Sequence, residues 1–221
     1  MANPSPAIDL EKARKVLSGL DAGERIKWMS SKVSQGIVAT TSGGETSRIL
    51  PHLIEKALDK TIPIIFIDTG HYSDETYLFV DKMQKDGVDI RYYTSEMSSK
   101  RMQALYGKLW ESQGEDFDKF LDITKHKPLN RAFRQLNASL WIRGLMGFKT
   151  NERSKIPILE YKNGLYRLYP MIDWTHAQAC QYLKSHNLPA NPVHHDLTKG
   201  PSGKQECKMG DKGGFVDGEG I

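Results

Sequence analysis

The sequence has only two cysteines, Cys180 and Cys207, among its 221 residues. Two thiols cannot build the disulfide framework of a small secreted protein, and they cannot supply the four thiolates that hold an iron–sulfur cluster within one chain. This cysteine usage indicates a reducing, cytoplasmic compartment. We therefore expect no iron–sulfur cluster, and no residue pattern leads us to expect another bound cofactor or a metal site.

Long apolar stretches are also missing. No run approaches the 18 or more apolar residues of a membrane span, and residues 1–6 lack the basic stretch and apolar block of a signal peptide. We expect neither a membrane segment nor a secretory signal. Hydrophobic residues still make up 38% of the chain, which is enough for a sizeable core and excludes disorder of the whole chain.

The chain has little excess charge, +4 in total, but the charge is unevenly distributed. Eight Lys and Arg residues and a single acid, Glu152, lie between Lys125 and Lys155. A local basic segment in a near-neutral protein favours a small polyanionic ligand over nucleic acid. The alternative is that these charges are scattered over a solvated surface.

The order of apolar runs and helical patterns predicts the fold class. Strands are predicted over 37–40, 63–67, 88–92 and 139–142, and helices over 49–58, from Ser73 onward and over 129–136. This alternation indicates an α/β fold with a mostly parallel twisted sheet and helices on both faces. Further on, Asn163-Gly164 predicts a hairpin between 158–161 and 165–169, and Thr175 caps a predicted helix to about Ser185.

The predicted domain organisation is an α/β domain over 1–198 and a mobile tail over 199–221. Seven of the 19 glycines lie between Gly200 and Gly220, where no apolar period is present. Such a segment has too little apolar surface to fold by itself.

The first candidate site is the segment Ser42-Gly43-Gly44-Glu45-Thr46-Ser47, between a predicted strand and a predicted helix. Glycines let backbone N–H groups approach an oxyanion, hydroxyls add donors, and the helix presents its positive end there. Open α/β sheets bind ligands at this edge, which favours a phosphate cradle. An ordinary strand-to-helix turn would use the same residue types.

Asp68-Thr69-Gly70 follows the second predicted strand in the equivalent place. The carboxylate either accepts hydrogen bonds from a ribose or adenine group, or caps the turn. In the basic segment, Arg143 ends a predicted strand, and its fork suits a phosphate or sulfate. Arg131 and Arg134 lie on a predicted helix, where a solvated role is equally compatible.

The two cysteines differ in their surroundings. Cys207 lies in the polar tail between Lys204 and Lys208, whose charges would lower the pKa of its thiol and favour the thiolate. Cys180 shares helical spacing with Ala177 and Leu183, which predicts a buried and inert thiol. Cys207 is therefore the candidate nucleophile, the alternative being an incidental exposed thiol.

Several short motifs follow one another along the chain. They are Asp68-Thr69-Gly70, Tyr106-Gly107-Lys108-Leu109-Trp110, Lys127-Pro128-Leu129-Asn130-Arg131-Ala132, Trp141-Ile142-Arg143-Gly144-Leu145, Pro170-Met171-Ile172-Asp173-Trp174 and Lys204-Gln205-Glu206-Cys207. As an ordered set from about Ala22 to Cys207, they resemble the phosphoadenosine phosphosulfate (PAPS) reductases. The resemblance implies an adenine-nucleotide α-hydrolase-like fold and the reduction of PAPS to sulfite and adenosine 3′,5′-bisphosphate.

The resemblance also implies roles and partners. Cys207 would attack the sulfonate sulfur, and thioredoxin or glutaredoxin would reduce the S-sulfocysteine. Phosphate would bind at Ser42, Gly43, Gly44 and Ser47, and the nucleoside side would be lined by Asp68 and Gly70. The 3′-phosphate and phosphosulfate would be neutralised by Lys127, Arg131, Arg143 and Arg153. A homodimer is expected, and neither nucleic acid nor a membrane is expected as a partner.

The chain departs from the family pattern in three places. Met146-Gly147 follows Gly144-Leu145 where the family usually has Arg-Arg, although Arg153 matches a later basic position. Lys208 follows Cys207 where the family continues Gly-Leu-His, and the connection from residue 192 to Cys207 is short.

Two other functions remain open at this stage. The segment from Ser42 to Ser47 is closer to the Ser-Gly-Gly-x-Asp-Ser loop of ATP pyrophosphatases, so an adenylating transferase that releases pyrophosphate is one alternative. A catalytically silent nucleotide-binding module is the other.

Overall fold

The structure, a computed structural model, describes residues 7–192 and contains a six-stranded sheet. The strands are β1 (Ile37–Thr41), β2 (Ile64–Asp68), β3 (Ile90–Thr94), β4 (Leu140–Arg143), β5 (Leu159–Lys162) and β6 (Leu165–Leu168). Their order across the sheet is β3-β2-β1-β4-β6-β5, and every neighbouring pair is parallel except β5 with β6. The predicted α/β class is confirmed.

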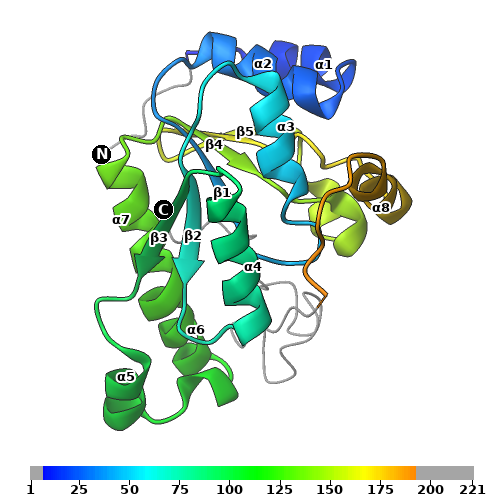
Figure 1. Cartoon of the computed structure of the whole chain (residues 1–221). Coiled ribbons are helices and arrows are strands. Elements are labelled where there is room, and N and C mark those ends of the chain that lie inside the picture. Colours follow the sequence, from blue (N-terminus) through cyan, green and yellow to red (C-terminus); the bar gives the residue numbers. More distant parts are fainter. Residues whose placement is uncertain (1–6, 193–221) are drawn as a thin grey trace.

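Helices cover both faces of this sheet. They are α1 (Leu10–Ser18), α2 (Ala22–Lys32), α3 (Ile49–Ala57), α4 (Asp74–Lys85), α5 (Ser99–Tyr106), α6 (Glu115–Leu121), α7 (Lys127–Gln135) and α8 (His176–Ser185). Short helical turns are η1 (Leu109–Glu111), the π-helix η2 (Asp122–His126), η3 (Gly147–Lys149) and η4 (Arg153–Lys155). In Figure 1, α1 and α2 lie at the top of the view, and α5 and α6 lie at the opposite end.

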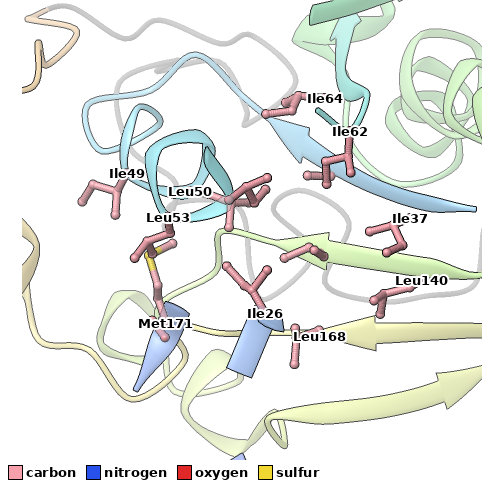
Figure 2. Packing of buried hydrophobic residues seen from close by; sticks show 14 of the residues in the cluster. Ile26, Ile37, Ile49, Leu50, Leu53, Ile62, Ile64, Leu140, Leu168 and Met171 are labelled. Atoms are coloured by element: carbon pink, nitrogen blue, oxygen red, sulfur yellow. The ribbon is translucent and has the colours of Figure 1, made fainter. Parts of the chain in front are cut away.

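The sheet separates two hydrophobic cores. The main core joins α1, α2, α3, α4 and α8 to one face, and Figure 2 shows Leu50, Leu53 and Ile26 turned toward strand residues such as Leu168. On the other face, Phe133 of α7 packs on Trp141 with ring centroids 4.9 Å apart. Successive side chains of β4 enter the two cores in turn, as expected for a strand covered on both faces: Leu140 and Ile142 lie in the main core and Trp141 in the other.

Local signals in the sequence placed several elements well. Asn163 and Gly164 both have positive φ, 54° and 79°, which is the backbone of the expected tight hairpin turn. Thr175 caps α8 through a capping box with Gln178. Strands β2, β3 and β4 each end one or two residues later than predicted, because pairing with neighbouring strands, rather than the apolar run, sets where they end.

The prediction of a buried Cys180 is wrong. Cys180 is exposed, as is Ala177, and its Sγ lies 3.6 Å from Nε2 of His176 one turn earlier. The face of α8 that packs on the core carries Ala179 and Leu183 instead. The spacing of apolar residues correctly predicted a helix. It assigned Ala177 and Cys180 to the buried face, where the structure has Ala179.

Strand order places the candidate loops. The chain proceeds from β1 to β2 to β3 on one side and then returns to place β4 on the other side of β1. The carboxyl ends of β1 and β4 therefore flank the point where the winding reverses, which is where open α/β sheets bind ligands. The boundary predicted at residue 198, the tail over 199–221 and Cys207 lie outside the described residues. Within residues 7–192, no helix has the length and apolarity that crossing a membrane requires.

Candidate functional site

The loop after β1 is held tightly and yet keeps free donors. Gly43 has φ +68°, and a Cβ there would lie 2.8 Å from Thr76 and 2.9 Å from Val80 of α4, so only glycine fits. The next three backbone N–H groups, of residues 44–46, donate no hydrogen bond to any described residue. Successive unpaired N–H groups in a turn form a concave anion site. Of the predicted cradle of Ser42, Gly43, Gly44 and Ser47, Gly44 contributes one of these N–H groups, whereas the N–H groups of Gly43 and Ser47 donate to the Thr41 hydroxyl and the Gly44 carbonyl. Phosphate binding at this loop stays a prediction.

Asn191 fastens this loop from far along the chain. Its side-chain amide donates to the Gly43 carbonyl at 2.8 Å and to the Thr76 hydroxyl at 3.1 Å, and Asn191 is 2% exposed. No sequence motif includes Asn191, which follows the last predicted helix, so the sequence gives no signal for this contact. The contact ties the segment leading toward Cys207 to the cradle.

Asp68 at the end of β2 caps its turn. Its Oδ1 accepts from the Gly70 N–H at 2.9 Å and from the Tyr77 hydroxyl at 2.7 Å. Burial and this carboxylate raise the pKa of Tyr77 far above its ordinary value, so Tyr77 remains a donor. Among the described residues, Oδ2 of Asp68 has no partner, so it remains available to a ligand hydroxyl or amine. Gly70 has φ +72°, and a Cβ there would lie 2.5 Å from the Ser99 hydroxyl.

Arg143 ends β4 beside the cradle, because Thr40 of β1 is its direct neighbour in the sheet. Its guanidinium lies 4.0 Å from the Trp141 ring centroid and donates to the Tyr169 hydroxyl at 3.1 Å. Tyr169 in turn donates to Glu160 at 2.5 Å. Arg143 is 3% exposed, and burial lowers the pKa of its guanidinium. A buried cation at this edge is an electrostatic counterpart for an oxyanion.

The loop after β4 differs from the family pattern for a packing reason. Met146 is 1% exposed and belongs to the main core. A Cβ on Gly147 would lie 2.7 Å from the Ile172 carbonyl oxygen, and the Gly147 N–H donates to that oxygen at 2.8 Å. The loop is thus closed against the Ile172 segment. Arg153 follows this loop and is 4% exposed, and its backbone N–H donates to the Thr150 hydroxyl at 3.1 Å.

The structure separates Lys127 and Arg131 from Arg143. Lys127 pairs with Asp122 at 2.7 Å, and that pairing raises the pKa of Lys127. Arg131 donates to the Thr94 carbonyl at 2.6 Å, at the end of β3. Strands β2 and β1 lie between β3 and β4, a separation of about 14 Å at the usual strand spacing. Lys127 and Arg131 therefore have these partners on the β3 side of the sheet, whereas Arg143 lies on β4.

Two pockets of the structure can be compared with the positions of the predicted site residues. Lys127, Arg131 and Arg134 line a hollow of about 390 Å³ near the end of β3. A larger one of about 600 Å³ lies between α2, α3 and α8, and none of the predicted site residues lines it. Position at the sheet edge, rather than size, therefore identifies the candidate site.

Lys125 is a second residue that sequence analysis did not single out. It lies in the π-helix η2 and is 4% exposed. Buried lysines are rare, and π-helical turns occur often at functional sites. Lys125 lies two residues before the motif that begins at Lys127. Burial distinguishes the two lysines, since Lys125 is buried and Lys127 is exposed. Within the described part of the chain, no three His, Cys, Asp or Glu side chains gather as metal ligands.

Comparison with known sequences identifies the family. The phosphoadenosine phosphosulfate reductase domain matches residues 36–197. A protein named phosphoadenosine 5′-phosphosulfate reductase from Zymomonas mobilis is 34% identical over 185 residues, covering 83% of this chain and 75% of that protein. One of the same name from Synechococcus is 34% identical over 192 residues, covering 86% and 82%.

Comparison with solved structures agrees. A phosphoadenylyl-sulfate reductase from Candida auris, solved as a phosphate complex, matches with a TM-score of 0.71 and 25% identity over 85% of this chain and 92% of that one. An ammonia-dependent NAD synthetase from Campylobacter jejuni, 14% identical over 82% of this chain and 75% of its own, with a TM-score of 0.52, shares the fold. This chain, with its glycine-containing loop after β1 and a buried arginine at the end of β4, belongs to the phosphoadenosine phosphosulfate reductase family.

Proposed function

We propose that the chain reduces PAPS to sulfite and adenosine 3′,5′-bisphosphate. The observation that carries this proposal is the pairing, at the point where the winding reverses, of three backbone N–H groups after β1 that donate to no described residue with the buried guanidinium of Arg143. Such a site fits a compact polyanion. The phosphate bound by the Candida auris reductase is consistent with this chemistry.

The proposed chemistry uses Cys207 as nucleophile. Its thiolate attacks the sulfonate sulfur, the sulfur–oxygen bond to the 5′-phosphate breaks, and adenosine 3′,5′-bisphosphate leaves with that oxygen. A thiolate of thioredoxin or glutaredoxin then attacks the Cys207 sulfur, expels sulfite, and the second thiol of the reductant resolves the mixed disulfide. The dithiol supplies the two electrons. The covalent intermediate divides one difficult reduction into two substitutions.

The chain's own groups would orient the substrate and neutralise its charge. Ser42, Gly43, Gly44 and Ser47 would hold the 5′-phosphate, while Asp68 and Gly70 would line the nucleoside. Arg143 and Arg153 would neutralise the 3′-phosphate and the phosphosulfate, and fixed cations contribute most to catalysis where charge develops in the transition state. Lys127 and Arg131, whose partners lie near β3 while Arg143 lies on β4, would contact a different part of the substrate or the reductant.

The setting proposed for this reaction is a cytoplasmic homodimer. A nucleophilic thiol and a dithiol reductant both require a reducing compartment, which agrees with the low cysteine content.

The decisive experiment measures sulfite released from PAPS in the presence of thioredoxin and its reductase. The wild-type chain should release sulfite, and Cys207→Ser should release none while still binding adenosine 3′,5′-bisphosphate. Cys180→Ser is the matched control and should remain active. Because Cys180 is exposed and so accessible to reagents, this control is essential.

A trapping experiment locates the covalent step. Without thioredoxin, wild-type protein given PAPS should accumulate a sulfonate adduct on the peptide that contains Cys207, detected by mass spectrometry. An adduct on Cys180, or an active Cys207→Ser variant, would refute the mechanism. Release of pyrophosphate from ATP would instead favour the adenylating transferase.

A further inference from the structure

Arg167 of β6 is a buried cation with unused donors. It is 2% exposed, and its Nε and Nη2 atoms are buried without a hydrogen-bond partner among residues 7–192. Fully buried arginines are almost always paired, because an uncompensated guanidinium loses its hydration and gains nothing in return.

Another buried arginine shows how this fold satisfies such a group. Arg25 is 3% exposed, and its guanidinium donates to the carbonyls of Leu17 and Pro170 and to both carboxylate oxygens of Asp173. Arg167 has no comparable set of acceptors. Its direct neighbour on β5 is Glu160, but that carboxylate accepts from Tyr169 and forms no ion pair with Arg167 in the described part of the chain.

The second buried arginine of this face lies next to Arg167. Trp141 is the direct neighbour of Arg167 on β4, and its ring centroid lies 5.7 Å from the guanidinium of Arg167 and 4.0 Å from that of Arg143. Burial is the main cause that lowers the pKa of Arg143, and the charge of Arg167 lowers it further, whereas Tyr169 and Glu160 raise it. Two cations therefore share one indole and one neighbouring carboxylate.

We propose that Arg167 and Arg143 together bind one tetrahedral oxyanion of the substrate that AMP lacks, either the 3′-phosphate or the sulfate. This inference rests on the proposed function and adds Arg167 to the substrate-binding residues. An oxyanion would accept from Nε and Nη2 of Arg167, for which no described residue supplies an acceptor, and would place a negative charge beside two buried cations. The 5′-phosphate is assigned to the loop after β1, which leaves these two groups for strands β4 and β6.

The test is calorimetric titration of wild type and Arg167→Met with AMP, adenosine 3′,5′-bisphosphate and adenosine 5′-phosphosulfate. Arg167→Met should bind at least one of the last two about tenfold more weakly or worse and should bind AMP within twofold of wild type. Loss with the bisphosphate alone identifies the 3′-phosphate, and loss with the phosphosulfate alone identifies the sulfate. Arg91→Met, which removes an exposed arginine paired with Asp89 on β3, is the matched control and should change none of the three.

Affinities within twofold for all three ligands, or equal losses for all three including AMP, would overturn the inference. The melting temperature of the ligand-free variant is a second readout, because loss of a purely structural arginine would lower it. Ligand-free Arg167→Met should melt no lower than wild type, because the substitution removes an uncompensated buried charge. A lower melting temperature with unchanged affinities would make Arg167 a structural residue.

Failure of the proposed function would look different. Wild-type protein that binds none of the three nucleotides would refute PAPS reduction while leaving the arginine pair testable with inorganic sulfate. Sulfate should then raise the melting temperature of wild type above that in chloride at equal ionic strength, and should not do so for Arg167→Met. Equal responses of the two proteins would overturn the pair.

Discussion

The loops after β1 and after β4 meet at the same edge of the sheet but are built in opposite ways. The loop after β1 is held through the Gly43 carbonyl and the close packing of Gly43, and the N–H groups of residues 44–46 donate to no described residue. The loop after β4 closes against the core through Met146 and donates its Gly147 N–H to the Ile172 carbonyl. The loop after β1 thus presents backbone N–H donors, whereas on the β4 side the positive charge is carried by arginine side chains of the strands.

This difference explains how the chain departs from its family's pattern at Met146-Gly147. A loop that packs into the core has no room for two charged side chains, and buried charge is found instead at Arg143 and Arg167 on the neighbouring strands. The two halves of the edge are therefore expected to respond to mutation in different ways.

The largest effect is expected from Met146→Arg, which introduces the type of residue that the family usually has there. It should destabilise the protein by about 3–5 kcal/mol, because an unpaired guanidinium would enter the main core. Urea denaturation measures this cost. Phe148→Arg in the same loop, at a side chain that is 43% exposed, should stay within about 0.5 kcal/mol. A mild Met146→Arg would mean that the loop opens readily.

Gly43→Ala should come next, at about 3 kcal/mol. The new Cβ adds overpacking against Thr76 and Val80 to the strain of a positive φ. Gly87→Ala separates the two effects, since Gly87 has φ +97° with nothing within 4 Å of its Cβ, and should cost about 1 kcal/mol. Gly43→Ala should also lose nucleotide binding in a titration. Equal costs for the two variants would contradict the close packing of the loop.

The smallest effect tests the segment that supports the β4 side. Asp173→Asn should cost about 2 kcal/mol near neutral pH, because Arg25 loses its charged acceptor. The hydrogen bonds from Arg25 lower the pKa of Asp173 below 3.8, so this stabilisation is present above the pKa of the unfolded chain and is lost as pH falls through the folded value. The two proteins should therefore converge in stability below about pH 4.

Chemical denaturation across pH measures this convergence. Asp86→Asn, which removes the carboxylate of an exposed pair with Lys82, is the control and should change stability by less than about 0.5 kcal/mol. A gap between Asp173→Asn and wild type that stays constant from pH 7 to pH 3 would show that the carboxylate charge is not what holds Arg25.

Much of the fold could be predicted from local patterns. Apolar runs predicted the central strands, Asn163-Gly164 predicted the hairpin, and Thr175 predicted the start of α8. Cys180 was misplaced because an apolar spacing defines a helix more surely than it defines which side packs. For the candidate site, position after a strand was enough to select the loop after β1 and Arg143.

The sequence by itself determined the α/β class, the family and the residue types available for chemistry, since these follow from periodicity, turn residues and ordered motifs. Only the tertiary structure decided which cations act together. Strand order sets Lys127 and Arg131 apart from Arg143, and strand pairing brings Arg167 beside Trp141 and Arg143. Asn191 reaches Gly43 only because α8 packs near α3 and α4 on one face of the sheet. Strand pairing and helix packing bring together side chains that are far apart along the chain, and short sequence patterns contain no information about such contacts.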